Sequence, residues 1–252
     1  MTLPASFLTT PLAHRGLHDQ TRGRPENSRA AFRAAIAAGY GIELDVQRAA
    51  DGAAMVFHDY DLPRLTGTEG TVRTTSAAAL GQIRLSGGDE AIPTLDEVLN
   101  LVAGQVPLLI EIKDQDGALG GDVGPLEQAV ADLLQGYSGD VAVMSFNPHA
   151  VAALAKAAPQ VPRGLTTCAF SPDDWGVSPE RAEHLTRIVD YDRLNACFVS
   201  HDRNDLANPR LAELRASGAG ILCWTIRTPD QEAEARKVAD NITFEGYAPV
   251  RA

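Results

Sequence analysis

The sequence has few cysteines, a deficit of basic residues and no long apolar run, and each shortage argues against a class of protein. Three cysteines in 252 residues, without Cys-x-x-Cys spacing, provide neither a disulfide framework nor a typical zinc site, so we expect buried thiols. The formal net charge of −11 argues against a nucleic-acid-binding surface and against adsorption to anionic membranes. No segment approaches the roughly 18 apolar residues of a membrane-spanning helix.

Targeting and nucleotide-binding signals are also missing. The segment 1–10 contains no Lys or Arg and no apolar stretch of adequate length, so it does not resemble a secretory signal. We therefore expect a cytoplasmic protein that neither binds nucleic acid nor inserts stably into a membrane, and the sequence leaves a homo-oligomer open. No Gly-x-Gly-x-x-Gly follows the first expected strand and no Gly-x-x-x-x-Gly-Lys-Ser/Thr occurs, which disfavours the common nucleotide-binding sheets.

What is present is a regular alternation of strand-like and helix-like segments. The residue patterns predict strands at 11–14, 41–46, 53–58, 106–113, 141–146, 161–166, 196–200, 221–226 and 241–244. They predict helices at 28–38, 94–102, 126–134, 148–157, 181–189, 209–217 and 230–238, and none for 171–179. About eight βα repeats without a linker predict an α/β fold, a (β/α)₈ barrel, as one domain over 1–252. A doubly wound open sheet is the alternative, because periodicity does not show whether a sheet closes.

One segment interrupts this alternation. Asp51-Gly52, between the second and third strand-like segments, predicts a hairpin-type turn. The following segment, 60–92, is polar, rich in Thr and Gly and weakly periodic. We interpret it as a small insertion, and the sequence leaves open whether it forms an ordered cap.

The strand at 41–46 carries two acidic side chains on one face. Its apolar residues alternate with Glu43 and Asp45, and the period of two places both carboxylates on the same side. In isolation this hexapeptide would also suit a solvent-facing edge strand. In a barrel, however, residues at the carboxyl ends of the strands face the active site. Seven polar residues fall at such ends and are expected to share one mouth: His14, Arg15, Glu43, Asp45, His58, Glu111 and Lys113.

These seven residues have a consistent chemistry. The three acids offer only oxygen ligands, which favours Mg²⁺ or Ca²⁺ over zinc. One divalent cation leaves them a single negative charge, and Arg15 and Lys113 add two positive charges, so a bound phosphodiester monoanion makes the site neutral. Imidazole has an ordinary pKa of about 6.5, which suits His14 and His58 to act as a general acid and base pair.

Seven motifs in order closely resemble the glycerophosphodiester phosphodiesterase family over roughly the first 115 residues. They are His14-Arg15-Gly16, Pro25-Glu26-Asn27-Ser28, Glu43-Leu44-Asp45-Val46, Asp51-Gly52, His58-Asp59, Ile92-Pro93-Thr94-Leu95 and Glu111-Ile112-Lys113. Weaker similarities follow at Ser145-Phe146 and Cys223-Trp224-Thr225-Ile226. The resemblance implies a TIM-type barrel, one divalent cation, and hydrolysis of glycerophosphodiesters to sn-glycerol 3-phosphate and an alcohol.

The resemblance also implies roles for individual residues. It assigns metal binding to Glu43, Asp45 and Glu111, acid and base catalysis to His14 and His58, and phosphate contacts to Arg15 and Lys113. It further implies that the glycerol 2-hydroxyl acts as an internal nucleophile, whose proximity to phosphorus favours the reaction. We also expect Trp224 and Phe146 to line the substrate pocket, and Glu26 and Asn27 to support the site.

Two features depart from the family pattern. The loop between Gly16 and Pro25 is longer than in many members and adds His18, Arg22 and Arg24 beside the mouth, although we expect His18 on the surface. Where many members have Thr-Asp-x-Pro, this chain has Thr243-Phe244-Glu245-Gly246-Tyr247, so no residue is assigned the role of the family's aspartate.

Two other functions remain as alternatives. A lysophospholipase D-type phosphodiesterase would act on lipid substrates and would need an apolar groove or a membrane-docking surface. The sequence shows no basic amphipathic segment for that purpose. A non-catalytic phosphate-binding barrel is the other alternative, although binding alone does not require an acid and base pair.

Overall fold

A closed ring of eight parallel strands lies at the centre of the computed structural model, which describes residues 1–250. In ring order the strands are β1 (Leu12–Ala13), β2 (Gly41–Arg48), β4 (Leu108–Ile112), β5 (Val141–Ser145), β6 (Arg163–Thr167), β7 (Phe198–Asp202), β8 (Gly220–Ile226) and β9 (Asn241–Phe244). β1 pairs with β2 on one side and with β9 on the other, so the sheet closes. The predicted (β/α)₈ barrel is confirmed, and the open-sheet alternative is wrong.

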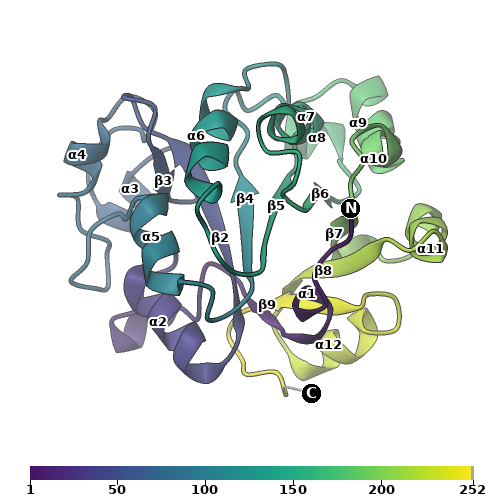
Figure 1. The fold of residues 1–252 in the computed structure, drawn as a ribbon, viewed down its shortest axis with the longest axis horizontal. Coiled ribbons are helices and arrows are strands. Elements are labelled where there is room, and N and C mark those ends of the chain that lie inside the picture. Colours follow the sequence, from purple (N-terminus) through teal and green to yellow (C-terminus); the bar gives the residue numbers. More distant parts are fainter. Residues whose placement is uncertain (251–252) are drawn as a thin grey trace.

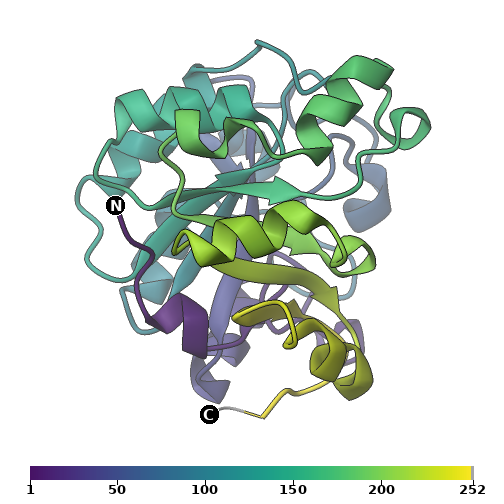
Figure 2. The ribbon, with the colours of Figure 1, turned by 90° about the vertical axis from the view of Figure 1, so that its right-hand side faces the viewer.

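Helices surround the ring, as Figure 1 and Figure 2 show from two directions. The longer ones are α2 (Arg29–Ala38), α5 (Leu95–Val102), α6 (Pro125–Leu134), α7 (Pro148–Ala157), α9 (Pro179–Thr186), α11 (Pro209–Ala216) and α12 (Pro229–Ala235). Local signals determine where several of them begin. The side chains of Ser28 and Thr94 each accept a hydrogen bond from a first-turn amide, and proline occupies the first turn of the last five.

Short helices fill several connections. They are α1 (Ser6–Thr9), α8 (Pro172–Trp175) and α10 (Asp190–Arg193), with the 3₁₀ turns η1 (Gln20–Arg22) and η2 (Arg203–Asp205). The helix α8 falls in 171–179, where no residue pattern predicted a helix. The helix expected at 181–189 instead begins at Pro179, because Ser178 caps it, and it ends at Thr186. Within residues 1–250, no helix is both long and apolar enough to cross a membrane.

The alternation of side chains along the strands separates the core from the site. On β4, Leu108, Ile110 and Ile112 pack in the main apolar core, which includes residues of the surrounding helices. Leu109 packs in a separate cluster with Phe7 of α1 and residues of β1, β5, β7 and β8. Glu111, two residues further along than Leu109, lines a cavity instead. The inside of the ring is therefore apolar at the level of Leu109 and acidic at the level of Glu111, which is nearer the carboxyl ends of the strands.

The insertion follows a short antiparallel strand, β3 (Ala54–Val56), which pairs with β2 as the Asp51-Gly52 turn predicts. β3 is shorter than the expected 53–58, so His58 lies in the loop beyond it. The insertion contains α3 (Pro63–Thr66) and α4 (Ala77–Leu80), both at the left of Figure 1. Its sparse apolar residues pack with Met55 and Phe57 in a second buried cluster. This packing gives the insertion a core despite its weak periodicity.

Candidate active site

A cavity of about 190 Å³ lies at the carboxyl ends of the strands. Its wall contains all seven residues that the strand ends predicted to share one mouth: His14, Arg15, Glu43, Asp45, His58, Glu111 and Lys113. Phe146 and Trp224, the two expected pocket residues, also line it. Glu26 and Asn27 do not line the cavity, but each contacts a side chain that does.

Three buried carboxylates form the centre of this cavity. The exposed fractions of Glu43, Asp45 and Glu111 are 2%, 2% and 6%, and one oxygen from each lies within 4.8 Å of the others. Strand register explains the arrangement, because Asp45 on β2 is directly opposite Glu111 on β4. Glu43 precedes Asp45 by two residues on the same face.

The electrostatics of this cluster fit a bound cation. Burial, together with the charges of Asp45 and Glu111, raises the pKa of Glu43 well above its ordinary value. Burial would also raise the pKa of Asp45, but His58, Lys113 and Arg15 outweigh it and hold that pKa low. The ionised form of Glu43 is thus disfavoured among protein groups alone. A divalent cation would relieve this repulsion, and three oxygen donors suit Mg²⁺ or Ca²⁺.

Two basic side chains flank the carboxylates. The Nζ of Lys113 lies 2.8 Å from Glu111 and 3.6 Å from Asp45, and these charges raise the pKa of Lys113 although burial lowers it. Arg15 Nε lies 3.5 Å from Asp45, and the Arg15 amide donates to Glu43 Oε2 at 2.9 Å. Arg15 has φ of 54°, in the left-handed region, where its neighbour Gly16 also lies. This turn at the end of β1 lets both the amide and the side chain of Arg15 face the site.

Glu26 and Asn27 support these groups from the loop before α2. Asn27 is fully buried, and its amide nitrogen donates to Asp45 Oδ2 at 2.9 Å. Glu26 accepts from Arg15 Nη1 at 2.5 Å and pairs with Arg64 of the insertion at 2.9 Å. Glu26 and Asn27 thus contact groups of the site rather than the cavity itself.

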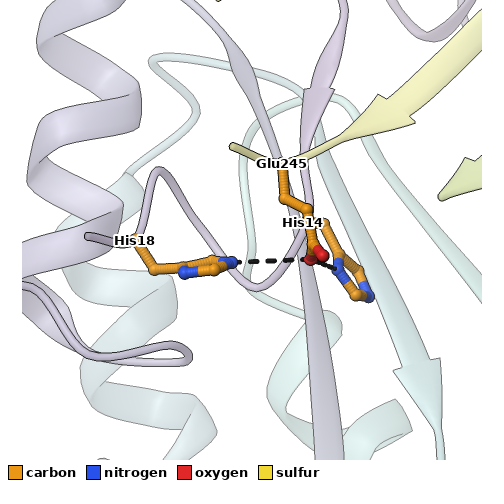
Figure 3. Close-up of side chains that lie close together, drawn as sticks. All are labelled: His14, His18 and Glu245. Atoms are coloured by element: carbon orange, nitrogen blue, oxygen red, sulfur yellow. Dashed lines mark hydrogen bonds and ion pairs between the residues drawn. The ribbon is translucent and has the colours of Figure 1, made fainter. Parts of the chain in front are cut away.

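His14 is held by a carboxylate from the other end of the chain. Figure 3 shows its Nδ1 pointing to Glu245, and the distance to Oε2 is 2.5 Å. Glu245 follows β9, which pairs with β1, and its other oxygen accepts from Arg227 Nε at 2.7 Å. Burial lowers the pKa of His14, and the hydrogen bond to Glu245 opposes that effect. With Nδ1 occupied, Nε2 is the ring nitrogen left for the cavity.

His18 approaches the same carboxylate. Its Nε2 lies 3.6 Å from Glu245 Oε2, on the side opposite His14 in Figure 3. Only 26% of its side chain is exposed. His18 is thus a partly exposed loop residue, and its approach to Glu245 is a contact that the sequence did not predict.

His58 has a local carboxylate partner. Its Nδ1 lies 2.7 Å from Oδ1 of Asp59, the next residue, and Asp59 also pairs with Arg64 at 2.5 Å. These hydrogen bonds hold the pKa of Asp59 low although burial would raise it. The side chain of Gln47 donates to the His58 carbonyl at 3.0 Å, which ties this loop to the end of β2.

An aromatic group forms the flank of the cavity near β5 and β8. The ring centroids of Phe146 and Trp224 are 5.5 Å apart, and Trp175 packs on Phe146 at 4.8 Å. The Trp224 indole donates to the carbonyl of Ser200 at 2.9 Å, so its polar edge is satisfied inside the barrel. The exposed parts of these rings offer an apolar surface to a ligand.

Sequence reasoning missed Glu245, Arg227 and Arg64, each of which contacts a predicted site residue or lines the cavity. One signal for Glu245 was available. It follows the last strand directly, and the rule that strand ends face the mouth applies there as well.

Together, the closed barrel and its mouth define a TIM-type protein. At that mouth three carboxylates could hold a divalent metal ion, and the basic side chains of Arg15 and Lys113 could hold an anionic ligand beside it. The model of the "Glycerophosphoryl diester phosphodiesterase family" matches residues 14–241. A glycerophosphodiester phosphodiesterase of Caldanaerobacter subterraneus subsp. tengcongensis is 32% identical over 93% of both chains.

Solved structures agree with these matches. An Oleispira antarctica phosphodiesterase, in complex with the product sn-glycerol-3-phosphate, superposes with a TM-score of 0.75, at 25% identity over 95% of this chain and 94% of the other. A Thermotoga maritima glycerophosphodiester phosphodiesterase gives 0.70, at 24% identity over 93% and 94%. The chain therefore belongs to the glycerophosphoryl diester phosphodiesterase family and is a phosphoric diester hydrolase. The resemblance seen in the sequence is confirmed.

Proposed function

We propose that this protein hydrolyses glycerophosphodiesters to sn-glycerol 3-phosphate and an alcohol, with one divalent cation. The observation that supports this most strongly is one cavity that combines three buried carboxylates with two histidines, each bonded to a carboxylate. The relative from Caldanaerobacter carries the name of this activity, and the Oleispira structure contains the product that the activity would release.

Glu43, Asp45 and Glu111 would hold the cation, and their oxygen-only donor set favours Mg²⁺ or Ca²⁺. A cation bound there polarises the phosphoryl oxygens and lowers the pKa of a nearby hydroxyl. Arg15 and Lys113 would contact the remaining phosphate oxygens, since both cations already face this cluster. Phe146 and Trp224 would pack on the glycerol carbons.

The two histidines would move the protons. In the first step the glycerol 2-hydroxyl attacks phosphorus while His14 Nε2 accepts its proton, because burial keeps this imidazole neutral. The bond from phosphorus to the alcohol oxygen breaks, and His58 donates a proton to the departing alkoxide. A cyclic phosphate and a free alcohol result.

Water completes the hydrolysis. His58, now neutral, takes a proton from water as the water oxygen attacks phosphorus of the cyclic phosphate. The bond to the glycerol 2-oxygen breaks, and His14 returns a proton to that oxygen. Both histidines end in their initial protonation states, and the product is sn-glycerol 3-phosphate.

Glu245 would act through His14 as a positioning residue. Its bond to Nδ1 fixes the proton there, so that Nε2 stays unprotonated and directed to the cavity. Asp59 has the equivalent contact with His58.

The direct test is release of glycerol 3-phosphate from glycerophosphocholine by the purified protein, measured with Mg²⁺, with Ca²⁺ and after chelation. We expect activity that chelation abolishes and either ion restores. Full activity in a rigorously metal-free preparation would contradict the metal requirement. Hydrolysis of lysophospholipids alone would favour the lipid phosphodiesterase, and phosphate binding without turnover would favour the non-catalytic barrel.

A further inference from the structure

A second cavity, of about 250 Å³, lies between the insertion and the loop after β4. Three of its lining residues stand two positions beyond residues of the active-site cavity: Gln47 beyond Asp45, Tyr60 beyond His58, and Gln115 beyond Lys113. Two residues of extended chain span at most about 7 Å, so the two cavities are neighbours at the same mouth.

Hydrogen bonds join two of these residues, Gln47 and Gln115, into one wall. Gln115 donates to the Gln47 side chain at 3.1 Å and to the Lys113 carbonyl at 2.8 Å, and Gln47 donates to the His58 carbonyl. The wall is therefore fixed to two residues of the active site. The active-site cavity, about 190 Å³, is smaller than the roughly 300–1,000 Å³ typical of small-ligand sites, whereas both cavities together reach that range.

The second cavity offers an aromatic face and a carboxylate without a counter-ion. Tyr60 is 47% exposed, so much of its ring is open to a ligand. Asp116 accepts hydrogen bonds from the amides of Ala118 and Gly120 at 2.9 and 3.3 Å, and no basic side chain within residues 1–250 forms an ion pair with it. Burial raises the pKa of Asp116, but the hydrogen bonds from these amides and from the side chain of Asp114 outweigh it and hold that pKa low, so Asp116 stays ionised at neutral pH.

The one basic residue lining this cavity, among those described, is already neutralised. Arg73 pairs with Asp122 at 2.7 Å and donates to the Gln115 carbonyl at 2.6 Å. Lys113, at the border with the active site, pairs with Glu111. An exposed aromatic ring next to an unpaired carboxylate is the arrangement that attracts a cationic group, and quaternary ammonium groups in particular.

We propose that this cavity, with Tyr60 and Asp116, binds the alcohol portion of the diester and selects alcohols that carry an ammonium group. This inference rests on the proposed function, because it places the departing alcohol beside His58. The glycerol phosphate portion lies in the active-site cavity, and the ammonium group lies against the Tyr60 ring and the Asp116 carboxylate.

The test compares two diesters that differ only in charge. One is glycerophosphocholine, and the other replaces choline with its uncharged isostere 3,3-dimethylbutanol. We expect kcat/KM to favour the choline ester by roughly fivefold or more. Asp116→Asn removes the charge and keeps the acceptor for both amides, and Tyr60→Leu removes the aromatic ring. Each should bring the ratio of the two kcat/KM values towards one, whereas Tyr60→Phe should retain it.

Both esters are measured on the same preparation, so the ratio does not depend on the fraction of folded enzyme. Asp132→Asn, on the exposed side of α6, is the matched control and should leave the ratio unchanged. Equal hydrolysis of both esters by the parent protein, or an unchanged ratio in Asp116→Asn and Tyr60→Leu, would overturn the head-group inference alone. Hydrolysis of neither ester in the presence of metal would overturn the proposed function with it.

Discussion

The two histidines of the active site have similar partners in different surroundings. His14 bonds to Glu245, which lies 231 residues away along the chain, and 15% of its side chain is exposed. His58 bonds to its neighbour Asp59, and 29% of its side chain is exposed. The first pair is held by two strands of the barrel, β1 and β9, whereas the second pair lies on a loop between β3 and the insertion.

From this difference we infer different roles for His14 and His58. In the proposed mechanism His14, directly after β1, takes the proton of the attacking hydroxyl, and its burial favours the neutral base. In the same mechanism His58, on the loop after β3, gives a proton to the departing alcohol, which we place beside the cavity of Tyr60 and Asp116. The rigid half of the site would accordingly serve the common glycerol phosphate group, and the loop half would serve the variable alcohol.

The largest expected effect comes from removing either imidazole. His14→Ala and His58→Ala should each lower kcat by about 10²–10⁴-fold, because a positioned acid or base contributes that much. The kcat of each variant is measured as the steady-state release of glycerol 3-phosphate at saturating metal. Near-normal turnover in either variant would remove that histidine from the proposed mechanism.

A smaller loss is expected when the partner of His14 is neutralised. Glu245→Gln should lower kcat by about 10–100-fold with KM little changed, because partners that orient a functional histidine have effects of this size. Glu232→Gln is the matched control, since Glu232 accepts from Tyr247 and Arg236 near the same end of the chain without lining the cavity. An equal loss in both variants would indicate a merely structural role for Glu245.

The partner of His58 should matter less. Both Asp59→Asn and Glu245→Gln keep an oxygen acceptor, but His58 is more exposed than His14, so water can replace the lost charge there and we expect a loss of kcat below that of Glu245→Gln. Measuring both variants on one substrate gives the comparison directly. A larger loss in Asp59→Asn than in Glu245→Gln would reverse the contrast between the two histidines.

The smallest expected effect is a shift in pH dependence. Glu245 raises the pKa of His14, opposing the lowering by burial. Removing its charge therefore lowers that pKa further, and the acidic limb of kcat/KM should move to lower pH in Glu245→Gln. A pH–rate profile of the variant and the Glu232→Gln control checks this. A move to higher pH would mean that another group determines the limb.

The sequence predicted the local parts of this site. Glu43 and Asp45 share a face because of the strand period, and His58 and Asp59 are neighbours along the chain. Glu111 joined the acids through the rule for strand ends. The fold class followed from the alternation of segments, but the closure of the sheet did not, since it depends on the pairing of β1 with β9.

The contact between His14 and Glu245 depends on that same closure, so no local pattern could show it. The insertion was recognised by composition, yet its buried cluster was not, because its apolar residues follow irregular turns rather than a helix or strand period. The approach of His18 to Glu245 was not predicted for the same reason, since it depends on how the loop after β1 folds.

The most direct test of the roles of His14 as base and His58 as acid uses a leaving group that needs no proton. With a nitrophenyl ester of glycerol phosphate in place of glycerophosphocholine, the loss in the single-turnover rate of nitrophenolate release in His58→Ala should shrink to within about tenfold of the parent protein, because nitrophenolate departs without an acid. This readout reports the first step alone, before the step in which His58 would act on water. The loss in His14→Ala should persist, because the attacking hydroxyl still needs a base. Restoration of His14→Ala, or an equal loss in both variants on this substrate, would contradict the assignment of base and acid.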